Sequence, residues 1–152
     1  MTLPPNCPTL DVEQLTAYLA KEFPQMGLGK NFTIEAVGPF TARLRLHYRS
    51  DHLRPGGTLS GPTIFALADV ALYVAILAQL GPVKLAVTTN LNINFLRKPG
   101  PRDLIGEARL FKLGKRLAVG EVTMVSLGDP EVVAHATGTY SIPPRGDDDG
   151  VL

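Results

Sequence analysis

The chain has 152 residues, 45% of them apolar, which is enough for one domain with a buried core and too little for two ordinary ones. Its formal net charge of +1 and its 7% aromatic content give no electrostatic reason to expect a nucleic-acid partner. The single cysteine, Cys7, excludes an internal disulfide and any Cys-x-x-Cys motif, and it fits a reducing cytoplasm.

Both ends of the chain have the composition of tails. Residues 1–8 include three prolines, and residues 143–152 include three consecutive aspartates. We therefore expect tails at 1–8 and 143–152 on either side of one domain at 9–142. The N-terminal sequence lacks the basic start and apolar run of a signal peptide, so we expect a cytoplasmic protein.

The first part of the domain predicts a short helix followed by two paired strands. Apolar residues recur at helical spacing through residues 11–23, and Pro24 and Gly27 follow as stop signals. Residues 40–48 then alternate between apolar and polar side chains, which indicates a half-buried strand. Residues 31–38 are its expected hairpin partner through Gly38-Pro39.

A long apolar segment and four further strands follow. The run from Thr63 to Leu80 approaches the length of a membrane span, but Asp69 interrupts it and Gly81-Pro82 end it, so we interpret it as a buried helix and expect no membrane. Segments 87–95, 103–113, 116–127 and 131–142 alternate as strands do. This order favours an α+β fold in which an antiparallel sheet covers one helix.

Asp69 is the single charged residue between Arg54 and Lys84. An unpaired carboxylate in a buried apolar segment costs several kcal/mol of desolvation. It is either satisfied by neighbouring polar groups or used in a reaction, and a carboxylate of this kind is a candidate general base.

The sequence that opens this helix resembles a motif of a known family. HLRPGGTLSGP at residues 52–62, followed by Ala68-Asp69, is similar to H-x-N-x-x-G-x-x-H-G-G and a later A-D pair in the PaaI-like (phenylacetate-pathway) hotdog-fold acyl-CoA thioesterases. The likeness extends over about residues 30–142. The matching positions are His52, Gly57 and Gly61, and the departures are Arg54, Ser60 and Pro62. The resemblance implies a hotdog fold and hydrolysis of acyl-CoA without a cofactor, by a homodimer that pairs into a tetramer.

The resemblance also implies roles for residues of the helix and of a nearby strand. Asp69 is the expected base or nucleophile, and the backbone N–H of Gly61 is the expected donor to the thioester oxygen, at a helix end that favours negative charge. Ser60 is interpreted as the helix N-cap, with a direct catalytic role as the alternative. Thr88, on the polar face of a strand that we expect to be central in the sheet, matches a position that holds substrate or water in the family, with an ordinary strand threonine as the alternative.

Helix geometry separates two of these groups. Gly61 and Asp69 are eight positions apart, or roughly 12 Å along one helix. One thioester carbonyl cannot contact both, so an active site that uses both needs two copies of the chain related by a two-fold axis. The family resemblance implies the same arrangement.

Other residues are candidates for contact with the substrate. Phe65, Leu72, Tyr73 and Ile76 share the helical face of Asp69 and are candidates to line an acyl pocket. Asn90 and Asn92 are assigned to the same strand face as Thr88. Three residues of the motif loop are further candidates for substrate contact: His52, Arg54 and Gly57. Two basic clusters are candidates to bind the coenzyme A phosphates: Arg97, Lys98 and Arg102 in the first, and Lys112, Lys115 and Arg116 in the second.

Two other functions stay open at this point. A non-catalytic module that binds acyl-CoA or an acyl-carrier protein is the first, because the motif's asparagine and second histidine are replaced. A hotdog hydratase is the second, but it needs an Asp/His acid–base pair that the motif does not supply.

Overall fold

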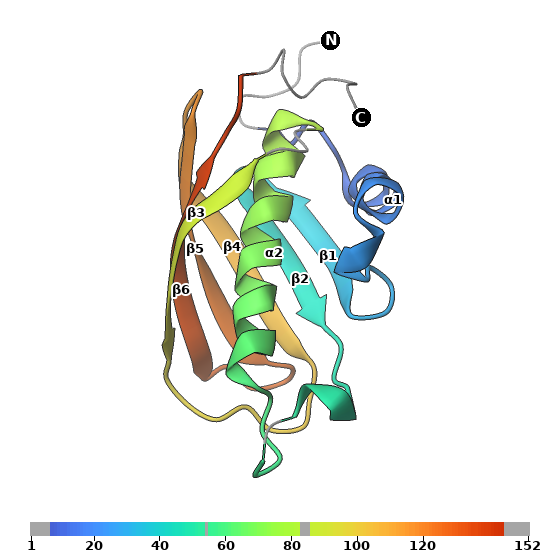
Figure 1. The fold of residues 1–152 in the computed structure, drawn as a ribbon, viewed down its shortest axis with the longest axis vertical. Helices are drawn as coiled ribbons and strands as arrows, with labels where there is room; N and C mark the ends of the chain where they lie inside the picture. The colour runs from blue at the N-terminus through green and yellow to red at the C-terminus, as the bar shows by residue number, and fades with distance from the viewer. Residues whose placement is uncertain (1–6, 54, 83–85, 145–152) are drawn as a thin grey trace.

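The computed structural model describes residues 7–53, 55–82 and 86–144, in which a six-stranded sheet wraps one long helix (Figure 1). Most of the two predicted tails lies outside the described residues, and so does Arg54. The α+β prediction is confirmed. The elements are α1 (Val12–Glu22), β1 (Phe32–Gly38), β2 (Thr41–Leu46), α2 (Gly61–Leu80), β3 (Val87–Phe95), β4 (Leu104–Leu113), β5 (Leu117–Ser126) and β6 (Val132–Ser141).

The sheet has the strand order β1-β2-β4-β5-β6-β3, and every neighbouring pair is antiparallel. Its concave side holds α2, and α1 lies beside β1 (Figure 1). The predicted hairpin of residues 31–48 is confirmed as β1 and β2, with Phe32 opposite Leu46. The segregated order of strands in the sequence therefore becomes a single sheet around one core.

The ends of both helices are set by local sequence. At α1, Asp11 accepts from the backbone N–H of Gln14, whose side chain accepts from the backbone N–H of Asp11, which is a capping box. At α2, Ser60 is extended and accepts from the backbone N–H of Thr63 at 3.4 Å, so the predicted N-cap is confirmed. Gly81 ends α2 with a φ of 86°, a conformation that favours glycine.

The predicted burial of α2 against the sheet is also confirmed. By length and composition α2 is apolar enough to cross a membrane, yet 56% of its most apolar window is buried inside the protein. Glycines on β4, β5 and β6 receive its leucines: a Cβ at Gly106 would lie 3.1 Å from Leu67, and Cβ atoms at Gly120 and Gly138 would lie 2.9 and 2.7 Å from Leu72. The helix approaches the sheet closely because these three strand positions have no side chain.

Strand β3 differs from the prediction in two ways. It lies at an edge of the sheet, paired with β6, and is not central. The register also shifts between Thr88 and Asn90, so that Thr88 is opposite Tyr140 whereas Asn90 is opposite Thr139. Because the two strands' paired side chains share a face, this β-bulge puts Thr88 on the concave side and Asn90 and Asn92 on the outer side. The prediction that these residues share one face is wrong.

Candidate active site

Asp69 lies in the third turn of α2, where the helix passes the β3–β6 edge of the sheet. Its side-chain Oδ1 accepts two hydrogen bonds, from the Thr88 hydroxyl at 2.6 Å and from the Tyr140 hydroxyl at 2.5 Å. The Tyr140 hydroxyl is also 2.8 Å from the backbone oxygen of Asp69. Three elements that are distant in sequence thus meet at one carboxylate.

A pocket of about 400 Å³ opens beside this carboxylate. Its walls are mostly apolar and aromatic, and they come from α2, the β3 and β6 ends, and the segment after α1: Phe23, Met26, Val70, Tyr73, Ala86, Val87, Thr88 and Tyr140. The rings of Tyr73 and Tyr140 are stacked with centroids 6.2 Å apart, and Phe23 meets Tyr73 edge-on at 6.4 Å. A small number of polar groups on an apolar pocket is the usual composition of a small-molecule site.

Tyr140 is the polar residue of this pocket that sequence reasoning missed, together with the apolar residues Phe23, Met26, Val70, Ala86 and Val87. It occupies a buried position of β6, where the alternating pattern gives an aromatic residue the role of core packing. Burial first, and then the negative charge of Asp69, raise the pKa of Tyr140 above its ordinary value, so the phenol stays protonated and donates. The available signal was the hydroxyl itself, because a buried phenol needs an acceptor.

Gly61 lies at the other end of the same helical face, in a separate pocket. This second pocket, of about 380 Å³, is lined by Thr58, Leu59, Gly61, Ile64, Phe95, Leu96, Arg97, Lys98 and Pro99. It shares no lining residue with the pocket beside Asp69. The first predicted basic cluster therefore lies near the N-terminus of α2, where Arg97 comes within 3.9 Å of Asp129.

The second basic cluster lies at the opposite end of α2. Lys115 and Arg116, in the β4–β5 turn, line a cavity of about 570 Å³ together with Leu80 and Ile142. Among the described residues neither cation has a carboxylate within ion-pair distance. Nothing in the sequence favours one basic cluster over the other as a phosphate site, whereas the structure places them at opposite ends of α2.

Several predicted contacts of Asp69 lie elsewhere. Tyr73 lines the pocket as predicted, but Leu72 and Ile76 are buried in the core and Phe65 is 39% exposed outside that pocket. Only Asp69, Val70 and Tyr73 of α2 line this pocket, because the other sides of the helix contact the sheet or lie at the surface. Asn92, on the outer side of β3, does not lie with Asp69.

The matched loop closes onto the start of α2. The backbone N–H of Ser60 donates to the backbone oxygen of His52 at 2.8 Å, and Leu53 pairs with Leu59. Gly57, with a φ of 78°, lies at the exposed tip of this loop. His52 lines a further pocket of about 380 Å³ that shares Phe23, Met26 and Val70 with the pocket of Asp69. His52 therefore lies beside the pocket of Asp69 and does not line it.

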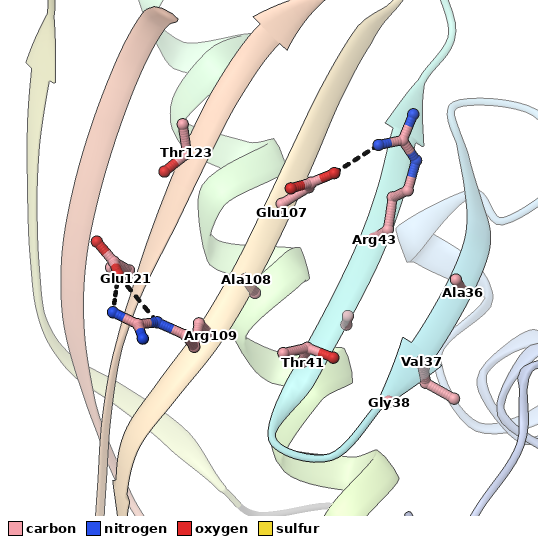
Figure 2. Close-up of a pocket in the computed structure, with 11 residues that line it drawn as sticks. Ala36, Val37, Gly38, Thr41, Arg43, Glu107, Ala108, Arg109, Glu121 and Thr123 are labelled. Carbon is pink, nitrogen blue, oxygen red and sulfur yellow. Dashed lines mark hydrogen bonds and ion pairs between the residues drawn. The ribbon is translucent and has the colours of Figure 1, made fainter.

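The outer face of the sheet carries another depression, of about 460 Å³ (Figure 2). Its charged side chains are already paired: Arg43 with Glu35 and Glu107, and Arg109 with Glu121. The Arg43 and Arg109 guanidinium groups lie on the side of the sheet away from α2 (Figure 2). This depression is therefore remote from Asp69, and its charges satisfy one another. Among the described residues no group of three or more His, Cys, Asp or Glu is placed to hold a metal ion.

Comparison with known proteins identifies relatives of this chain. A family model described as the thioesterase superfamily matches residues 56–133, slightly more than half of the chain. A candidate thioesterase from a Silicibacter species is 50% identical with a TM-score of 0.83, covering 90% of this chain and 94% of that one. A variant of the phenylacetic acid degradation protein PaaI from Thermus thermophilus is 30% identical with a TM-score of 0.68, covering 79% and 99%.

A curated relative agrees with these structures. A candidate esterase of Saccharolobus solfataricus is 32% identical over 137 residues, which are 89% of this chain and 87% of the relative. The predicted hotdog fold and the resemblance to PaaI-like thioesterases are confirmed by these matches.

Proposed function

The chain belongs to the thioesterase superfamily, and we propose that its reaction is the hydrolysis of acyl-CoA to a free acid and coenzyme A. The observation that carries this proposal is the Asp69 carboxylate on the wall of an apolar pocket. Among the described residues Asp69 accepts from two hydroxyls but has no cationic partner. A carboxylate on the wall of a substrate-sized pocket is placed to act as a general base or as a nucleophile.

The proposed reaction uses two groups of α2, the backbone N–H of Gly61 and the carboxylate of Asp69. The backbone N–H of Gly61 donates to the thioester oxygen as it becomes negative, and the helix N-terminus favours that charge. Asp69 either takes a proton from an attacking water or attacks the carbonyl carbon itself and is then released by water. Both routes break the carbon–sulfur bond, release the coenzyme A thiolate and leave the acid.

Two copies of the chain are needed for this site. The separation of roughly 12 Å between Gly61 and Asp69 along α2 agrees with their lining different pockets. An antiparallel partner helix that brings Asp69 to Gly61 has its two-fold axis close to Phe65, which is midway between them in sequence. Phe65 is 39% exposed, as are Val87, Phe95 and Leu96 to larger extents, and burial of such side chains favours a dimer. We propose a homodimer that pairs into a tetramer.

The walls of the two pockets support an assignment of the two halves of the substrate. We assign the acyl group to the pocket beside Asp69, whose walls suit aromatic or medium-chain groups. The coenzyme A phosphates are assigned to Arg97 and Lys98, because this cluster borders the pocket that contains Gly61. Lys115 and Arg116 are the second candidate for the phosphates.

We also propose a cytoplasmic location, with which the free thiol of Cys7 agrees.

A thiol-release assay with a panel of acyl-CoA esters tests the proposal. We expect turnover by the wild type, and no measurable turnover by Asp69→Asn with an unchanged melting temperature, since the amide preserves volume but not the base. Asp51→Asn is the matched control, because Asp51 is exposed and forms an ion pair with Arg49 and with no other residue that the structure describes. Tight binding of acyl-CoA without thiol release would instead favour the non-catalytic binding module.

A further inference from the structure

We propose that Tyr140 is a positioning residue that fixes Oδ1 of Asp69, so that Oδ2 is the oxygen that reacts. This inference rests on the proposed thioesterase function, because it assigns a task within the same site. It adds a residue outside the matched motif and distinguishes the two oxygens of the carboxylate.

The first support is the convergence of two donors on one oxygen. The hydroxyls of Tyr140 and Thr88 approach Oδ1 at 2.5 and 2.6 Å, whereas no described group donates to Oδ2. Two donors to Oδ1 hold the carboxyl plane against rotation, and they satisfy the oxygen that they contact. Oδ2 is then the oxygen with free lone pairs for a water proton or for the thioester carbon.

The second support is that both donors belong to one cross-strand pair. Thr88 and Tyr140 are directly opposite each other on β3 and β6, and the β-bulge after Thr88 is what turns this threonine to the concave side. Without the bulge, an unbroken alternation from Asn90 would put Thr88 on the outer side with the asparagines. The sheet register therefore sets both hydrogen bonds at once.

The third support is that Tyr140 keeps an acceptor when Asp69 changes state. Its single proton has two acceptors on the same residue, Oδ1 and the backbone oxygen at 2.8 Å. If Asp69 gains a proton or an acyl group at Oδ2, the phenol can donate to the backbone oxygen or continue to donate to Oδ1. Tyr140 is 3% exposed and its ring stacks on that of Tyr73, so the hydroxyl is held in place throughout.

Tyr140→Phe removes the hydroxyl and keeps the stacked ring, so it is the appropriate test. We expect kcat to fall by about 10-fold or more with KM changed little, the size expected for loss of one charge-assisted hydrogen bond. The acid limb of the pH–rate profile should move to higher pH, because the charged carboxylate loses a donor. Tyr48→Phe is the matched control, since Tyr48 lies after β2 and is 36% exposed. Unchanged kcat and pH profile in Tyr140→Phe would overturn the proposal.

A second measurement examines the contact without reference to turnover. In a double-mutant cycle of Tyr140→Phe and Asp69→Ala, followed by denaturant unfolding, the two effects on the unfolding equilibrium should be non-additive by about 5-fold or more. Additive effects would overturn the contact. If the wild type hydrolyses no acyl-CoA, the proposed function fails while this cycle still decides whether Tyr140 holds Asp69.

Discussion

Mixing two inactive variants measures whether Gly61 and Asp69 act across a dimer. Asp69→Asn removes the proposed base, and Gly61→Val adds a branched side chain to a residue that lines the pocket beside Arg97. A Cβ at Gly61 would lie 3.6 Å from the Phe95 ring, which is an ordinary van der Waals contact, so the added Cβ itself does not displace the ring. Each homodimer is expected to be inactive because each of its sites has one defect.

The recovered activity follows from symmetry. If the two variants are unfolded together and refolded in equal amounts, about half of the dimers contain one chain of each kind. In such a dimer one site combines Asp69 and Gly61 from unchanged positions, and the other site carries both defects. One working site in half of the dimers gives about a quarter of the wild-type activity.

The assay is thiol release from acyl-CoA, with mass spectrometry of the intact dimers to measure subunit exchange. Wild-type protein taken through the same unfolding and refolding corrects for losses. If Gly61 and Asp69 served a site within one chain, every chain in the mixture would carry a defect. Confirmed exchange without recovered activity would therefore reject the shared site and the reaction proposed for it.

Three further predictions concern stability and assembly. Ser60→Ala should lower the free energy of unfolding by about 1 kcal/mol through loss of the N-cap, and should reduce turnover less than Asp69→Asn does; the reverse pattern would indicate a catalytic serine. Gly120→Ala should lower the free energy of unfolding, measured by urea denaturation, by about 1–3 kcal/mol, because the new Cβ would lie 2.6 Å from the backbone oxygen of Arg109. Gly114→Ala is the control: its Cβ has its closest contact at 3.5 Å, so the free energy of unfolding should hardly change. Phe65→Glu should convert the proposed dimer to monomers, as measured by sedimentation velocity, and should abolish turnover as well; an active monomer would contradict the two-chain site.

Local sequence was sufficient for the two α-helices, the strands and the position of the candidate base, Asp69. The start of α2 could be predicted because Ser60 is a strong N-cap and Gly81 accepts the φ of 86° that ends the helix. Strand β5 alternates in burial along its whole length, and β4 and β6 do so over part of theirs, as their sequences alternate in polarity. Asp69 was conspicuous because an isolated carboxylate in an apolar helix needs partners or a function.

Tertiary structure alone decided what surrounds that carboxylate. The alternation of side chains along β3 predicts which face each residue lies on only while the hydrogen bonding between the strands is regular. The bulge after Thr88 interrupts it, and that bulge depends on pairing with β6. Tyr140 is 71 positions from Asp69, and its sequence pattern is that of an ordinary core aromatic. The hydrogen bond between them depends on how α2 lies across the sheet, and that placement is set by long-range packing against Gly120 and Gly138, which no local pattern encodes.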